Sequence, residues 1–130
     1  MRLLYLWGPV LAHMALIFAA SSRSDTSAVP SAIPDKVVHF AVYAVLGALI
    51  LRAVSGRRRS GVTRSGLLAS VFIATLYGVS DEWHQSFVPG RTPDAMDVVA
   101  DLAGASAGAL ATAIASNRLR RGPAHSARST

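Results

Sequence analysis

The chain contains 130 residues, 52% of them hydrophobic and only 15% charged, which is more apolar than a soluble domain of this size requires. Its formal net charge of +6 does not predict a nucleic-acid partner, because long apolar runs separate the basic residues and prevent them from forming one basic stripe. The absence of cysteine excludes disulfides, a thiolate nucleophile and cysteine-bound metals, so the composition indicates a single membrane domain.

Four apolar runs, at residues 3–20, 37–54, 62–80 and 98–116, predict an all-α integral membrane bundle of four transmembrane helices. A helix rises about 1.5 Å per residue and the hydrocarbon core is about 30 Å thick, so runs of this length can span it with their polar flanks. We expect one domain over residues 1–116 and a basic cytoplasmic tail over residues 117–130. The first run could also be a cleaved signal peptide, since Arg2 precedes it, but it is long for a signal core.

The two ends of the predicted bundle carry opposite charge. All seven acidic residues lie in or beside the first and third loops, together with only three of the 13 basic residues. The other ten lie at the amino terminus, around the second loop or beyond the fourth run: Arg2, Arg52, Arg57, Arg58, Arg59, Arg64, Arg118, Arg120, Arg121 and Arg128. Basic loops are retained in the cytoplasm during insertion. We therefore expect a multi-pass protein of the cell membrane with both termini cytoplasmic (N-in/C-in) and its acidic side outside.

Polar residues open the second predicted helix. Pro34 and Asp35 suit the first turn of a helix, where unpaired N–H groups and the positive end of the dipole are exposed. His39 and Tyr43 follow Asp35 at steps of four, so all three share one face that descends into the membrane. Asp35 could pair with His39 across one turn. A histidine within a span faces the bundle interior or a polar cavity, which favours a functional role over a merely buried one.

The third predicted helix ends in two adjacent acids, Asp81 and Glu82, near its carboxyl terminus. Acids there oppose the helix dipole, so local helix energetics do not explain them. Gln85 shares the face of Asp81, since it lies four residues further on. Trp83 is typical of an interfacial anchor, and His84 is either a ligand or an exposed interfacial histidine.

The fourth predicted helix carries one stripe of acids and glycines. Thr92 is expected as its N-cap and Pro93 as its first residue. The stripe then recurs at steps of three and four along one face: Asp94, Asp97, Asp101, Gly104 and Gly108. The two glycines form a G-x-x-x-G pattern that lets another helix approach closely, and oligomerisation through this face is one possibility.

The polar residues therefore gather at the outer ends of three helices. Candidate substrate-binding residues are Asp35, Lys36, His39, Tyr43, Gln85, Arg91, Asp97 and Asp101. Carboxylates at this density repel one another unless Lys36 and Arg91, protonation or a bound divalent cation relieves the charge. Candidate metal ligands are Asp81, Glu82, Asp94 and Asp97, and oxygen-rich ligands favour Mg²⁺ or Mn²⁺ over Zn²⁺.

Three segments resemble the motifs of the VanZ-like membrane proteins: residues 35–43 (DKVVHFAVY), 81–91 (DEWHQSFVPGR) and 97–108 (DVVADLAGASAG). Ser21 and Ser22 resemble the family's Ser-Ser after the first span. The family is named for a protein that confers low-level resistance to the glycopeptide antibiotic teicoplanin. The resemblance thus implies a cell-envelope membrane protein with a link to antibiotic resistance and no assigned reaction. The family often has asparagine at the position of Asp101, so this residue can act as a hydrogen-bonding group in either form.

These observations leave three hypotheses, in order of preference. In the first, the outer residues bind a membrane lipid, an anionic head group or a lipid-linked cell-wall intermediate, with Lys36 and Arg91 on its phosphate or carboxylate. In the second, the chain is a membrane-embedded hydrolase or transferase that acts on a lipid head group. Its catalytic candidates are His39, Asp81 and Glu82, with His39 as a general base paired with Asp35 or Asp81. In the third, the polar residues form only an interhelical packing network.

Overall fold

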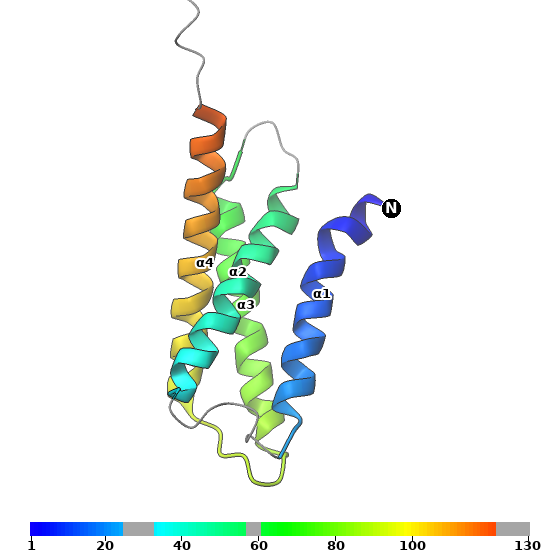
Figure 1. Cartoon of the computed structure of the whole chain (residues 1–130), viewed down its shortest axis with the longest axis vertical. Helices are drawn as coiled ribbons and strands as arrows, with labels where there is room; N and C mark the ends of the chain where they lie inside the picture. Colours follow the sequence, from blue (N-terminus) through cyan, green and yellow to red (C-terminus); the bar gives the residue numbers. More distant parts are fainter. Residues whose placement is uncertain (25–32, 57–60, 122–130) are drawn as a thin grey trace, which may run out of the picture.

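The computed structural model describes residues 1–24, 33–56 and 61–121, and over these residues the chain is an all-α bundle (Figure 1). The helices are α1 (Arg2–Ser21), α2 (Asp35–Ser55), α3 (Arg64–Gln85) and α4 (Ala95–Arg121). Each coincides within a few residues with one of the four apolar runs. The predicted all-helical bundle is therefore confirmed.

Three of the described helices, α1, α2 and α4, are long and apolar enough to cross a membrane. The helix α3 is not among them, although its 22 residues give it a length of about 33 Å. Its sequence explains the difference, since it opens on Arg64 and closes on the polar residues of the second motif segment, Asp81 to Gln85. The bundle thus combines three strongly apolar helices with one that is polar at both ends.

The start of α4 corrects the expected cap. The helix begins at Ala95, and the Asp94 carboxylate accepts a hydrogen bond from the Met96 backbone N–H at 2.8 Å. Asp94 therefore caps the helix, and Thr92 and Pro93 lie in the preceding loop. A carboxylate at this position also interacts favourably with the positive end of the helix dipole, which a threonine hydroxyl does to a lesser degree.

The carboxyl end of α4 also differs from the expectation. The helix continues to Arg121, so the first five residues of the predicted tail, 117–121, are helical. Residues 122–130 of that tail, the middle of the first loop (25–32, with Asp25) and the arginines at 57–59 lie outside the described residues. The expectations for those segments are not addressed by the structure.

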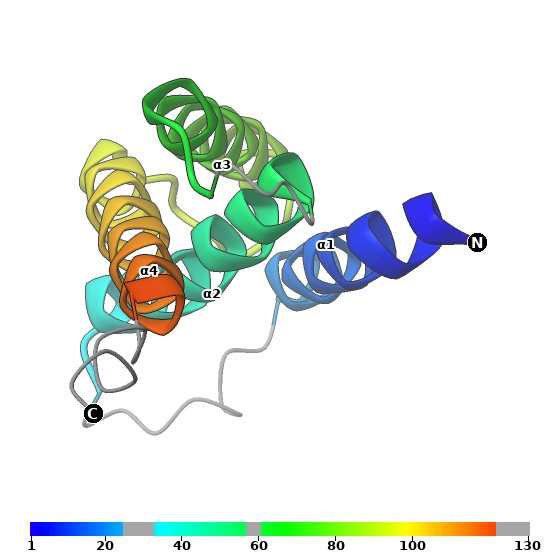
Figure 2. The same ribbon diagram turned by 90° about the horizontal axis from the view of Figure 1, so that it is seen from above.

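The helix α2 is the centre of the bundle and contacts α1, α3 and α4 (Figure 2). Glycines bring α2 and α4 close together. A Cβ atom on Gly104 would overlap the Phe40 carbonyl, and one on Gly108 would overlap the Ala44 carbonyl. Helices approach this closely where their facing residues lack side chains. The G-x-x-x-G face therefore packs against α2 within the chain, and oligomerisation through it stays a prediction.

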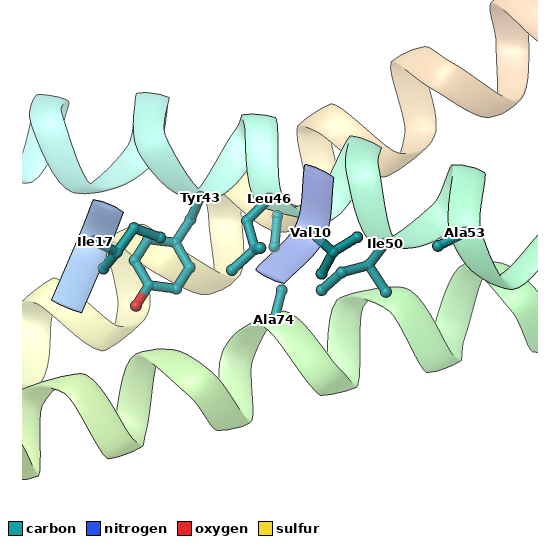
Figure 3. Packing of buried hydrophobic residues seen from close by; sticks show 8 residues of the cluster. Val10, Ile17, Tyr43, Leu46, Ile50, Ala53 and Ala74 are labelled. Atoms are coloured by element: carbon teal, nitrogen blue, oxygen red, sulfur yellow. The ribbon is translucent and has the colours of Figure 1, made fainter. Parts of the chain in front are cut away.

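The apolar core lies between α2 and its neighbours (Figure 3). The largest contributions come from α2, with Tyr43, Leu46 and Ile50 at 1% exposure or less. Val10 from α1 and Ala74 from α3 pack against them. Many large apolar side chains point outward instead, among them Leu4, Leu16, Leu68, Phe72, Trp83, Val99, Leu102 and Ile114. An outward apolar surface of this extent suits a lipid environment.

The loops place the acidic residues at one end of the bundle. The end of α1, the start of α2, the end of α3 and the start of α4 all meet there (Figure 1). The described arginines Arg2, Arg52, Arg64, Arg118 and Arg120 belong to the opposite ends of their helices. The tertiary structure therefore keeps the charge separation that the sequence indicated.

Candidate functional site

The first part of the site is a polar network that joins α1 to α3. The Ser21 hydroxyl donates to Asp81 Oδ1 at 2.6 Å, and Gln85 Nε2 donates to Asp81 Oδ2 at 3.1 Å. The same Gln85 amide donates to Glu82 Oε1 at 3.3 Å, while Glu82 Oε2 accepts the Asp94 backbone N–H at 2.9 Å. All four carboxylate oxygens of the adjacent acids thus have a hydrogen-bond donor. Two of these donors, Ser21 and the Asp94 N–H, come from outside α3. They stabilise the two acids at a helix end where the dipole is unfavourable for them.

The second part of the site joins α2 to α4 through Lys36. Its ammonium donates to Asp94 Oδ2 at 2.6 Å and to Asp97 Oδ1 at 3.3 Å. Asp94 is half exposed at its side chain, whereas Asp97 is 7% exposed. The hydrogen bond from Lys36 holds the pKa of Asp94 below its ordinary value, helped by the bond from Met96. The pair therefore stabilises the fold above the ordinary pKa of an aspartate and loses this contribution as the pH falls through the lowered value.

The third part of the site is a histidine and a buried carboxylate. His39 Nδ1 lies 2.9 Å from Asp101 Oδ1, and the Asp101 side chain is 1% exposed. The hydrogen-bond partner of His39 is therefore Asp101, where the sequence suggested Asp35 or Asp81. Its other nitrogen, Nε2, lies 3.9 Å from Asp97 Oδ2, which is too long for a hydrogen bond.

A glycine on α3 makes room for Asp101. A Cβ atom on Gly78 would lie 2.5 Å from Asp101 Oδ2, so this position cannot accept a larger residue without displacing the carboxylate. Two buried polar atoms near this point, Asp101 Oδ2 and the Tyr43 hydroxyl, have no hydrogen-bond partner among the described residues. The Tyr43 hydroxyl points from α2 toward α3 in Figure 3. Buried polar atoms are normally paired, so a network that served only packing would not leave these two atoms without a partner.

A cavity of about 400 Å³ opens beside these networks, between α1, α2, α3 and the third loop. Apolar side chains contribute to its lining, among them Leu16, Ile17, Val38 and Val42. The lining also includes polar side chains: Ser21, Arg23, Asp35, His39, Tyr43, Asp81, Gln85 and Arg91. The volume falls within the range of about 300 to 1,000 Å³ that ligand pockets occupy. The cavity is therefore shaped for an amphipathic molecule.

Arg91 is held in place at the rim of this cavity by backbone carbonyls. Its Nε donates to the Arg23 carbonyl and its Nη2 to the Ala20 carbonyl, both at 3.3 Å. Gly90 has a φ of 81°, a conformation that glycine readily adopts, and it turns the loop so that Arg91 reaches α1. Among the described residues Arg91 forms no ion pair, so its charge can still attract an anion.

The structure brings together most of the residues that the sequence singled out, but not as the predicted metal set. The oxygens of Asp81 and Glu82 are taken by Ser21, Gln85 and a backbone N–H, and those of Asp94 face Lys36 and Met96. The group with ligand atoms close enough for one ion is instead Asp35, His39 and Asp97. The reason is that α2 faces α4, so the ligands come from these two helices.

The structure also places His84, whose role the sequence left open, and Ser21, whose contact with Asp81 the sequence did not predict. His84 does not reach the cavity: its Nε2 lies 3.0 Å from the Ser22 hydroxyl, and its ring stacks on Phe18 at 4.5 Å. Ser21 holds Asp81 directly, a contact that only the packing of α1 against α3 creates. In the sequence, this contact was indicated only by the resemblance of the Ser21-Ser22 pair to the family pattern.

Comparison with known proteins gives one family and one relative. A family model described as VanZ/LLP1 matches residues 6–116. The chain is also similar to an uncharacterized protein of Schizosaccharomyces pombe, with 34% identity over 93 residues, which is 72% of this chain and 55% of that protein. This chain therefore spans about half the length of its curated relative. No solved structure matches it.

Proposed function

Since the chain belongs to the VanZ/LLP1 family of membrane proteins, we propose that it binds the head group of an envelope lipid in the cavity between α1, α2 and α3. The observation that carries the proposal is that both apolar and polar side chains line this cavity. The apolar side chains of α1 and α2 suit an alkyl chain, and the polar residues suit a charged head group. Arg91 and Arg23 at the rim would attract its phosphate.

Two sources of such a head group are a membrane phospholipid and a lipid-linked cell-wall intermediate. The relative in Schizosaccharomyces pombe favours the phospholipid, because a yeast makes no peptidoglycan. A lipid-linked wall intermediate would instead connect the site to glycopeptide resistance of the teicoplanin type. Expression in a susceptible bacterium separates the two, since only the wall intermediate predicts a raised tolerance to teicoplanin.

Lipid retention by the purified protein tests the proposal. We expect native mass spectrometry of the detergent-purified wild type to show a bound lipid, and Arg91→Ala to retain about ten- to a hundredfold less of it. This loss corresponds to the hydrogen bonds that a charged donor makes to an anion. Arg64→Ala is the matched control, because Arg64 is an exposed arginine at the opposite end of the bundle. Equal recovery of lipid from Arg91→Ala and wild type would contradict head-group recognition by Arg91.

The proposal includes an orientation in which all four helices cross the membrane and both termini are cytoplasmic. It is supported by the arginines at one end of the bundle and the acids at the other (Figure 1). We expect reporter fusions at residue 61 and after residue 121 to report the cytoplasm, and a fusion at residue 90 to report the outside. A reporter at residue 61 that is active outside the cell would reverse the site's sidedness.

A second candidate function is a hydrolase or transferase acting on the same lipid. The specific observation for it is the His39 and Asp101 pair, since a buried carboxylate on Nδ1 orients an imidazole as a general base on its other nitrogen. The two serines at the carboxyl end of α3 do not hydrogen-bond to His39 within the described residues. The hydroxyls of Ser80 and Ser86 donate to carbonyls of their own helix, Tyr77 and Trp83. Catalysis would therefore use water as the nucleophile.

A purely structural role accounts for part of the site only. The chain of bonds from Ser21 through Asp81, Gln85 and Glu82 to Asp94 links α1 and α3 to the third loop, just before α4. A packing network would not need the two unpaired buried atoms or an exposed Asp35 beside an open cavity. We therefore prefer ligand binding to a packing role.

A further inference from the structure

Three side chains on two facing helices bring potential metal ligands together beside the cavity. Asp35 and His39 belong to α2 and Asp97 to α4, and one ligand atom from each lies within 4.8 Å of the other two. No other group of three or more such residues occurs in the portions of the chain that the structure covers. Two of the three, Asp35 and His39, also line the cavity.

The orientation of His39 is that of a metal-binding histidine. Asp101 can only accept a hydrogen bond when ionised, so the proton sits on Nδ1 and the lone pair of neutral imidazole is on Nε2. Metal-bound histidines usually donate their other N–H to a carboxylate in this way. Nε2 lies 3.9 Å from Asp97 Oδ2. Bonds of about 2.0 to 2.2 Å to one ion allow its ligand atoms to lie up to about 4.3 Å apart, so both atoms can reach it.

Asp97 provides an independent observation. Its side chain is 7% exposed, and its Oδ1 accepts from Lys36 at 3.3 Å. Its Oδ2 accepts no hydrogen bond within the described segments and faces the nitrogen of His39. A cation placed between Oδ2 and Nε2 would give this oxygen a partner that no described donor supplies.

The net charge of the side chains around Asp35, His39 and Asp97 also favours a bound divalent cation. Within the described residues, Lys36 contacts the carboxylates of Asp94 and Asp97, while those of Asp35 and Asp101 lie close to His39. These four carboxylates outnumber the positive charges of Lys36 and a protonated His39 by two. Carboxylates this close repel one another, and a bound divalent ion would balance the surplus.

We propose that Asp35, His39 Nε2 and Asp97 Oδ2 bind one divalent cation beside the cavity, where Asp35 and His39 line it. Two carboxylates and one imidazole match the Mn²⁺ and Mg²⁺ class, and Zn²⁺ is the competitor that shares these ligands. Protein ligands fill only part of the shell of such an ion, so positions stay open toward the cavity. A phosphate oxygen of the lipid could fill one of these positions. That step rests on the proposed function, whereas binding of the ion itself does not depend on it.

Manganese titration of the full chain tests this site. The detergent-purified protein is stripped with a chelator, delipidated and titrated with Mn²⁺, while electron paramagnetic resonance follows the free ion. We expect one Mn²⁺ per chain and a ¹⁴N coupling from the imidazole in pulsed spectra. Asp35→Asn should weaken binding at least tenfold, and it cannot do so by unfolding the chain because Asp35 is exposed. Asp101→Ala should weaken it about ten- to a hundredfold, as for other groups that orient a ligand histidine.

His84→Ala is the matched control, because His84 is a histidine at the same end of the bundle that contacts Ser22 and Phe18 outside the cavity. It should bind Mn²⁺ as the wild type does. Absence of Mn²⁺ binding by the wild type, binding without a ¹⁴N coupling, or loss of binding in His84→Ala with full binding in Asp35→Asn would each overturn the assignment. Because no lipid is present, these outcomes are independent of whether Arg91 retains a lipid.

Discussion

Replacing His39 with alanine is expected to abolish lipid retention while the protein still inserts into the membrane. His39 lines the cavity and its side chain is 12% exposed, so its loss removes a polar contact at the point where the head group would lie. Its one hydrogen bond, to Asp101, contributes only about 1–3 kcal/mol to stability, which leaves the bundle folded. Native mass spectrometry of bound lipid, with membrane fractionation in parallel, measures both effects.

His84→Ala is the control for this variant. His84 lies at the same end of the bundle, but it contacts Ser22 and Phe18 outside the cavity. We expect it to retain lipid like the wild type. A His39→Ala protein that fails to insert, or that unfolds as soon as it is extracted, would instead support a packing role for the polar network.

The same pair of proteins distinguishes binding from catalysis. When the lipid that co-purifies with the wild type is incubated with fresh protein, a hydrolase releases a water-soluble head group and a binding protein does not. If release occurs, His39→Ala should reduce it by at least a hundredfold, the usual contribution of a general base. An unchanged lipid after long incubation with the wild type would leave binding as the function of the cavity.

The second large effect is expected at the contact between α2 and α4. Gly108→Leu places a side chain where the Ala44 carbonyl lies, so the two helices must separate. Overpacking of this kind costs about 1–3 kcal/mol, and more where the obstacle is backbone. We expect a large fall in the thermal unfolding temperature in detergent. Lipid retention should fall as well, since the distance between His39 and Asp101 depends on how closely these helices pack.

Ala107→Leu is the matched control, because Ala107 is the next residue on α4 and its side chain is exposed. It places the same leucine side chain on the outer surface, where it meets lipid or detergent. Its unfolding temperature should stay close to that of the wild type. Equal stability of the two leucine variants would show that α2 and α4 do not pack through Gly108.

Much of the fold could be predicted because it follows from local patterns. Four apolar runs of membrane-spanning length predict four helices, and the distribution of Arg2, Arg52 and Arg64 against Asp35 and Asp81 predicts which ends meet. Helical spacing also places Asp35, His39 and Tyr43 on one face without any knowledge of the neighbours. Length, charge and period are properties of single segments, so the sequence contains them directly.

The partners of the polar residues were decided by the tertiary structure alone. His39 bonds Asp101, 62 residues away, in preference to Asp35 one turn earlier, because the glycines of α4 bring its backbone against α2. The same packing brings ligand atoms of Asp35, His39 and Asp97 close together and places Gly108 against Ala44 of α2. Helical periodicity tells which residues share a face, but which faces meet depends on side-chain shape across helices that are distant in the sequence.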